Sequence, residues 1–326
     1  MHKLSRVLAG AMAALALAGG ACAQTAWPSR PIRIVVPFGA GSGLDVMARG
    51  FAQRLGEQAK VAVVVENKEG AGGTIGAVAA MRAPADGYTL LFTANGPFAV
   101  APYMQEAATY DPASDFTPIA KVALIPMVLI TGKNSRFQRF EDVVTEARAH
   151  PGKLDYASSG VGTPSNMNVE VIKRKLGLDI VAVPYKNTGQ AMTDLISGQT
   201  ALYMPSFPAA LTQLKAGQAR GLAIGSARRS RLMPDIPTVA EVVKEPGLEA
   251  SVWYGFLAPK DLPPELAERI HAEIAKAAAS PQIVALTATL GAEPVLVGPR
   301  EFREQVRHDA EESRKLLQAL GVKRER

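Results

Sequence analysis

Short apolar runs alternate with longer segments whose apolar residues recur at helical spacing. Residues 32–36 form an apolar run of strand length, and in residues 46–55 Met47, Phe51 and Leu55 recur every four positions, which predicts a helix. Residues 61–65 and 88–93 are two more strand-like runs, with a helical segment at 75–81 between them. This alternation predicts parallel sheets with crossover helices, so we expect an α/β fold.

The alternation restarts after Pro118. Residues 122–131 predict a connecting strand, and residues 140–149 predict a helix that stops at His150-Pro151-Gly152. Further strands are expected at 154–158, 180–183, 201–204, 219–225 and 252–258, and further helices at 166–176, 190–196, 264–279 and 299–320. The two halves share one device, a strand followed by a glycine-rich loop and a helix.

Residues 1–23 have the pattern of a secretory signal peptide. Lys3 and Arg6 form a positive start, residues 7–18 are apolar but too short to span a bilayer, and Ala21-Cys22-Ala23 is a small-x-small cleavage site. Cleavage after Ala23 removes Cys22, the only cysteine, and leaves a periplasmic chain without disulfides. Lipidation of Cys22 is the alternative, although Gly19 stands where lipoprotein signals usually carry an aliphatic residue.

The charge balance does not indicate a nucleic-acid partner. The full chain carries +6, and removal of Lys3 and Arg6 lowers this to +4 (6 − 2). The densest basic cluster, Arg228-Arg229-Arg231, is short and has no interleaved aromatic residues, so we expect a solvated loop there. No later segment approaches the ~20 consecutive apolar residues of a membrane span, and a soluble mature protein is expected.

The loop after the first strand is rich in glycine and opens a helix. It reads Pro37-Phe38-Gly39-Ala40-Gly41-Ser42-Gly43-Leu44-Asp45. Glycines allow a ligand close to the backbone, and a helix N-terminus offers unpaired N–H groups with partial positive charge. Since α/β sheets bind ligands at the carboxyl ends of their strands, this loop predicts an anion site. Its expected ligand-binding residues are Phe38, Gly39, Ala40, Ser42, Gly43 and Asp45.

Asp45 is expected to be the N-cap of that helix. Its charge would repel a carboxylate, so either Asp45 turns away from the ligand or the ligand also carries an amino group.

Other loops carry polar groups at strand ends. Glu69-Gly70-Ala71-Gly72-Gly73-Thr74 opens a helix, and Thr93-Ala94-Asn95-Gly96 ends another strand. In Gly160-Val161-Gly162-Thr163-Pro164-Ser165-Asn166, Thr163 is the expected N-cap and Pro164 the first helical residue. Ligand contacts are expected from Thr93, Asn95, Gly160, Gly162, Thr163, Ser165 and Asn166.

Enzymatic alternatives lack essential residues. Gly39 and Gly41 fit a dinucleotide fingerprint, with Glu66 as the ribose-binding acid, but Leu44 replaces its third glycine and export removes the usual supply of cofactor. A hydrolase using Ser42 or Ser159 has no G-x-S-x-G elbow. His150, His271 and His308 have no metal-pair spacing and are expected to be solvated. We therefore expect no enzyme activity, cofactor or metal.

At these loops the sequence resembles that of the Bug family, the periplasmic solute receptors of tripartite tricarboxylate transporters. The similarity covers nearly all of the mature chain. Its blocks are Trp27-Pro28-Ser29-Arg30-Pro31-Ile32, Val36-Pro37-Phe38 with the glycine-rich loop and Asp45, Val65-Glu66-Asn67, Gly70-Ala71-Gly72-Gly73, Asp86-Gly87-Tyr88-Thr89-Leu90-Leu91, Tyr110-Asp111-Pro112, Asp115-Phe116, Val183-Pro184-Tyr185-Lys186 and Pro234-Asp235-Ile236-Pro237-Thr238.

The resemblance implies a periplasmic-binding-protein (Venus flytrap) fold of two α/β domains with a central ligand cleft. Domain 1 would comprise residues 24–125 plus 250–326, and domain 2 residues 126–249. The ligand, a small mono-, di- or tricarboxylate, would lie between the first loop and residues 160–166, with Tyr185 and Ser206 adding contacts, and would pass to membrane permease subunits. The receptor would be a monomer and not an enzyme; a sensor subunit that reports to a membrane kinase is the alternative.

The sequence departs from the family pattern on the second domain's side of the cleft. Asn166-Met167 stand where the family often has histidine and leucine, and Asn187 stands where a glycine is usual. Ala201 and Pro205 stand where acidic residues are common. These differences leave the chemical class of the ligand open.

Overall fold

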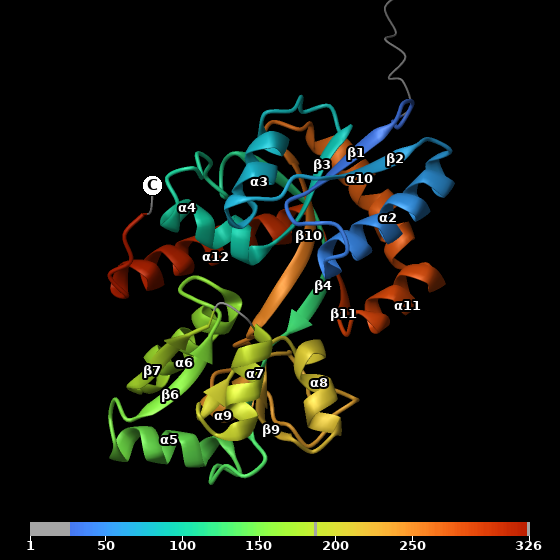
Figure 1. Ribbon diagram of the computed structural model, residues 1–326. Helices are drawn as coiled ribbons and strands as arrows, with labels where there is room; N and C mark the ends of the chain where they lie inside the picture. Colours follow the sequence, from blue (N-terminus) through green and yellow to red (C-terminus); the bar gives the residue numbers. More distant parts are fainter. Residues whose placement is uncertain (1–26, 186–187, 325–326) are drawn as a thin grey trace, which may run out of the picture.

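The computed structural model describes residues 27–185 and 188–324, so the expected signal peptide lies outside the described residues (Figure 1). Figure 1 shows two lobes joined by two long strands, β4 (Phe116–Pro126) and β10 (Ser251–Pro259). Within the described part of the chain, no helix combines the length and apolar character needed to cross a bilayer.

The first lobe is built on a six-stranded sheet of order β11-β4-β10-β3-β1-β2. Besides β4 and β10 it contains β1 (Ile32–Val36), β2 (Val63–Asn67), β3 (Thr89–Ala94) and β11 (Glu293–Val297). Helices α2 (Gly43–Ala59), α10 (Pro264–Ala278) and α11 (Pro281–Thr289) cover one face. The other face carries η2 (Ala71–Gly73), α3 (Thr74–Met81), η3 (Gly96–Val100), α4 (Ala101–Met104) and α12 (Pro299–Ala319).

The second lobe is built on a five-stranded sheet of order β7-β6-β8-β5-β9. Its strands are β5 (Val128–Gly132), β6 (Leu154–Ser158), β7 (Ile180–Pro184), β8 (Leu202–Tyr203) and β9 (Ala219–Ile224). Its helices are α5 (Phe140–Ala149), α6 (Pro164–Leu176), α7 (Thr188–Ser197), α8 (Phe207–Lys215) and α9 (Val239–Val243). Separate apolar cores fill the two faces of each sheet.

The predicted parallel pairing holds for part of each sheet. Strand β1 runs parallel to β2 and β3, and β6 runs parallel to β7 and β8. Strand β10 is antiparallel to β3 and β4, and β5 is antiparallel to β8 and β9. Strand β10 is antiparallel to β4 because the chain that enters the second lobe through β4 returns to the first lobe through β10.

The single strand expected over residues 122–131 is wrong. The chain forms β4 and β5 there, which belong to different sheets, with Met127 between them. Every residue of both strands is buried, so the apolar run carries no mark of the change of sheet. The sequence pattern also missed η2, η3, α4, α8, α9, α11 and β11.

Candidate functional site

The first loop, residues 37–45, is shaped by Gly41 and capped by Ser42. Gly41 has φ +83°, a conformation that favours glycine. Ser42, and not Asp45 as expected, is the N-cap of α2, and its hydroxyl accepts from the Asp45 N–H at 3.2 Å. The expectation was wrong because the chain turns helical at Gly43, which places Asp45 inside the first turn.

The Asp45 carboxylate is turned into this loop. It is only 2% exposed and accepts hydrogen bonds from the Gly41 N–H at 2.9 Å, Asn67 Nδ2 at 2.8 Å and Arg49 Nε at 3.0 Å. Burial alone would raise the pKa of Asp45, but the hydrogen bonds from Arg49, Gly41 and Asn67 and the Arg49 charge lower it. The carboxylate is therefore ionised, and its charge is offset by Arg49.

The second loop, residues 159–166, has the expected helix start. Thr163 is the N-cap of α6 and Pro164 its first residue. The polar side chains here bond within the loop: Thr163 Oγ1 donates to the Gly160 carbonyl at 2.7 Å, and Ser165 Oγ accepts from the Ser159 N–H at 3.0 Å. These side chains stabilise the loop, so the groups it can offer to a ligand are mainly backbone groups.

The second loop touches the first lobe. A Cβ at Gly162 would lie 2.1 Å from Met104 Sδ and 3.0 Å from Val100 Cγ1. On another flank, a Cβ at Gly291 would lie 2.6 Å from Cγ of Pro208 at the start of α8. The glycines at both places therefore permit the two lobes to meet at close range.

Other expected ligand residues stand at strand and helix ends. Thr93 Oγ1 and Asn95 Oδ1 are buried without a hydrogen-bond partner, although Asn95 Nδ2 donates to the Ser251 carbonyl at 3.2 Å. Tyr185 donates to Asp194 at 2.9 Å. Ser206 is the N-cap of α8, and its hydroxyl makes no capping hydrogen bond. Thr93, Asn95 and Ser206 thus retain hydrogen-bonding capacity.

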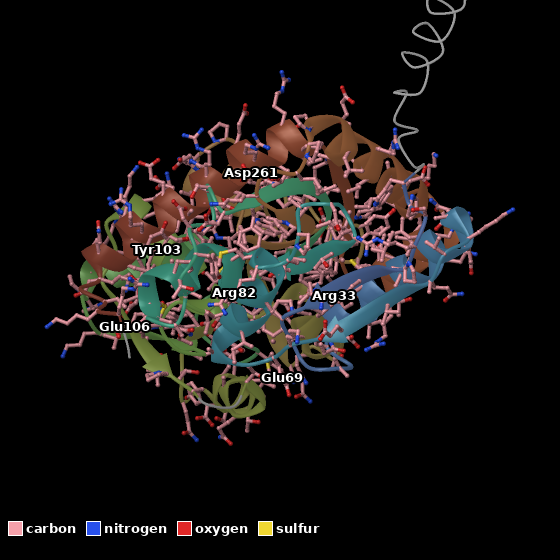
Figure 2. The ribbon with its side chains drawn as sticks, turned by 90° about the horizontal axis from the view of Figure 1, so that it is seen from above. Arg33, Glu69, Arg82, Tyr103, Glu106 and Asp261 are labelled. Carbon is pink, nitrogen blue, oxygen red and sulfur yellow. The ribbon has the colours of Figure 1, made fainter. Side chains whose placement is uncertain are left out.

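Glu69, which sequence reasoning did not single out, adjoins the first loop. A Cβ at Gly39 would lie 2.6 Å from Glu69 Oε2, and Figure 2 labels the exposed Glu69 side chain. Its only sequence signal is its position before Gly70 in a second glycine-rich segment.

A cavity of about 750 Å³ lies between α6 and α12, and Asn95 and Gly162 stand at its margin. Lys121 of β4 donates to Gln305 of α12 at 2.6 Å, and Trp253 of β10 donates to Asp309 at 2.7 Å. Both crossing strands are thereby tied to α12. Burial lowers the pKa of Lys121 and raises the pKa of Asp309.

The serines and histidines form no catalytic arrangement among the residues described. Ser42 is used in helix capping, and none of the described hydrogen bonds joins Ser42 or Ser159 to a histidine. His150 is an exposed helix end and His308 an exposed position on α12, as expected, but His271 is half-buried, with Nδ1 3.0 Å from the Ile119 carbonyl oxygen. Over residues 27–185 and 188–324, there is no cluster of three or more potential metal ligands.

Two α/β lobes, two antiparallel crossing strands and glycine-rich loops at helix starts define the two-domain fold of periplasmic solute-binding proteins. The model of the tripartite tricarboxylate transporter family receptor (TctC) matches residues 46–322, so the chain belongs to that family. Protein BugT of Bordetella pertussis is 33% identical over 324 residues, which cover 99% of each chain. The expected family, fold and solute-receptor class are therefore confirmed.

Solved structures show the same fold. The periplasmic binding protein BugD has 30% identity and a TM-score of 0.69, covering 92% of this chain and 100% of that chain. Rpa4515 of R. palustris, solved with adipate, has 31% identity and a TM-score of 0.72, with the same coverage.

Proposed function

We propose that this receptor captures a small organic carboxylate between the first and second loops, on the periplasmic side, and delivers it to the membrane subunits of a tripartite transporter. The domains would be those expected from the sequence, residues 24–125 plus 250–326 and residues 126–249, with a signal peptide at 1–23. The receptor would act as a monomer, and closure would follow from a ligand that contacts both lobes.

The pair of loops carries this proposal. Each is a glycine-rich turn that ends at an N-cap and leads into a helix of 17 or 13 residues, α2 or α6. Helix N-termini favour anions through unpaired N–H groups and the helix dipole. Rpa4515, which is 31% identical to this chain, was solved with adipate, a dicarboxylate.

Within this site we assign side-chain contacts to Thr93, Asn95 and Ser206, and backbone contacts to groups of both loops other than the Gly41, Gly160 and Gly162 N–H groups, which are bonded within the lobes. Thr93 and Asn95 have buried oxygens without partners, and Ser206 is an N-cap whose hydroxyl is not used for capping. Asp45 offers no uncompensated negative charge to a carboxylate, because Arg49 Nε lies 3.0 Å from it.

Thermal unfolding with a panel of acids tests the proposal. Acetate, succinate, adipate, citrate and aspartate, compared with chloride at equal ionic strength, separate carboxylate number from the effect of an amino group. An affinity near micromolar is about −8 kcal/mol, and ligand at ~100 times Kd should stabilise the protein by about 2.7 kcal/mol. Unchanged melting with all five acids would contradict carboxylate binding, and a response to aspartate alone would indicate an amino-bearing ligand.

Crosslinking in membranes tests the delivery step. The expected product joins the liganded receptor to a permease subunit. A product with a membrane kinase in its place would show that the receptor serves a sensor.

A further inference from the structure

The first and second loops contain the same seven-residue pattern. Residues 39–45 read Gly-Ala-Gly-Ser-Gly-Leu-Asp and residues 160–166 read Gly-Val-Gly-Thr-Pro-Ser-Asn. Both fit G-x-G-[ST]-x-x-[DN], and both connect a buried strand to a helix. The shared positions are a first glycine, a second glycine, a hydroxyl-bearing N-cap and a polar residue three positions after it.

The backbones of the two loops match at the second glycine and at the N-cap, whereas the first glycine has a positive φ only in the second loop, where Gly160 has φ +108°. The second glycines, Gly41 and Gly162, have φ +83° and +80°. The N-caps have φ −65° and ψ 155° at Ser42, and φ −75° and ψ 157° at Thr163. The N–H of each N-cap donates to the carbonyl of the first glycine at 3.3 Å, and its carbonyl accepts from the N–H four residues on at 2.9 Å.

The last residue of each pattern holds the second glycine. Asp45 Oδ2 accepts from the Gly41 N–H at 2.9 Å, and Asn166 Oδ1 accepts from the Gly162 N–H at 3.2 Å. Each bond spans four residues and closes the loop on the first turn of its helix. Because it fixes a glycine that has many alternative conformations, the bond lowers the entropy lost when a ligand binds.

Each of these side chains is fixed in turn by hydrogen bonds to other side chains. Behind the first loop, Arg49 donates to Asp45 and to Asn67 Oδ1, and Asn67 Nδ2 also donates to the Phe38 carbonyl at 2.9 Å. This network therefore extends beyond the first loop to side chains of α2 and β2.

Behind the second loop, Asn166 Nδ2 donates to Tyr156 Oη at 2.7 Å, and Tyr156 donates to Glu170 at 2.8 Å. Lys173 completes the chain through Glu170 at 2.7 Å. Both networks are charge-balanced, Asp45 by Arg49 and Glu170 by Lys173. Neither hydrogen-bond network therefore adds a net negative charge to its loop.

We propose that Asp45 and Asn166 are equivalent positioning residues of the solute site, each of which holds the second glycine of its loop in the same conformation without contacting the ligand itself. The inference rests on the proposed function, since it concerns the same two loops. Removal of either side-chain acceptor frees the glycine that it holds and weakens solute binding. A charged carboxylate and a neutral amide are both sufficient as that acceptor.

Three variants and one control test this assignment. Asp45→Ala and Asn166→Ala remove the acceptors, and Asp45→Asn retains one. Asp142→Ala is a matched control, because Asp142 Oδ2 accepts from the Gln138 N–H at 2.7 Å across the same four-residue span at the start of α5, in neither loop. Affinity is measured calorimetrically with the five acids named above, and amide exchange is measured at Gly41 and Gly162.

The two alanine variants in the loops should raise Kd by about tenfold and speed exchange of their own glycine amide by about as much, because each loses the hydrogen bond that holds that glycine. Asp45→Asn should stay within about threefold of the wild type. The Asp142→Ala control should melt at a lower temperature but keep the wild-type Kd.

Unchanged Kd in both loop alanine variants would overturn the assignment, and so would an Asp45→Asn variant as weak as Asp45→Ala. A comparable rise of Kd in Asp142→Ala would show that the loss of affinity comes from general destabilisation, and this result would also overturn the assignment. Absence of binding by the wild-type protein itself would instead refute the proposed function, and the assignment with it.

Discussion

Replacing Gly162 by alanine places a methyl group where the second loop meets the first lobe. The position combines two costs that can be separated. Gly162 has φ +80°, and a Cβ there would lie 2.1 Å from Met104 Sδ and 3.0 Å from Val100 Cγ1. The backbone cost belongs to the second lobe alone, whereas the steric cost exists only while the lobes touch.

Gly177 supplies the matched control. It caps the other end of α6 with φ +62°, and a Cβ there would meet no atom within 4 Å. Alanine in a left-handed conformation costs about 1–2 kcal/mol, so Gly177→Ala should lose that amount of unfolding free energy. Met104 can move because its side chain is flexible, but the β-branched Val100 cannot easily do so, so Gly162→Ala should lose about 1 kcal/mol more.

Urea unfolding of both variants gives the difference directly. Met104→Ala introduced into Gly162→Ala should recover most of the additional loss, because it removes the thioether from the path of the methyl group. Equal losses in Gly162→Ala and Gly177→Ala, or no recovery from Met104→Ala, would refute the contact between the lobes as the cause.

Three further changes have defined outcomes. Because the pKa of Asp45 is lowered, its ionised form stabilises the fold above the ordinary pKa of aspartate, and this stabilisation is lost as pH falls through the lowered value. Asp45→Asn should therefore have a free energy of unfolding about 1 kcal/mol below that of the wild type at pH 7 and equal to it in acid. A difference in urea unfolding that persists in acid would contradict this. Asp309→Ala leaves Trp253 Nε1 without its acceptor and should lower the free energy of unfolding, measured by thermal unfolding, by about 1–3 kcal/mol. Asp309→Asn keeps an acceptor oxygen and should lose less than half as much. Equal losses in the two variants would contradict this. Gly225→Ala would place a Cβ 1.7 Å from the Ala250 carbonyl oxygen, a backbone atom that cannot rotate away, so a loss of about 3 kcal/mol or more is expected, and wild-type melting would show that the two segments separate readily.

The hydrophobic pattern was sufficient for most of the fold. The predicted bounds of β1, β6 and α5 agree with the structure residue for residue. These elements have a clear period and end at glycine, proline or a change of polarity. The passage from β4 to β5 could not be predicted in the same way, since pairing with β10 and β9 decides it and those partner strands lie far along the chain, at Ser251–Pro259 and Ala219–Ile224.

The sequence predicted the two loops of the candidate site but not the hydrogen bonds that hold them. Residue type and spacing located both glycine-rich turns, and Thr163-Pro164 was sufficient to place the start of α6. The role of Asp45 could not be read in this way, because serine and aspartate are both good N-caps and only the turn at Gly41 decides between them. The partners Asn67 and Tyr156 come from neighbouring strands, and no local pattern joins them to the loops.

The two loops are alike in construction, so they are poor candidates for distinguishing one acid from another. Their side chains at the N-cap and at the end of the pattern are occupied by hydrogen bonds within each lobe, which leaves backbone N–H groups that any carboxylate can satisfy. Discrimination requires groups with unused hydrogen-bonding capacity, because a group left unpaired by the wrong solute costs about 1–3 kcal/mol. Thr93, Asn95 and Ser206 have that capacity. We therefore expect substitutions at these three residues to change which acid is preferred, and substitutions at Asp45 or Asn166 to weaken all acids alike.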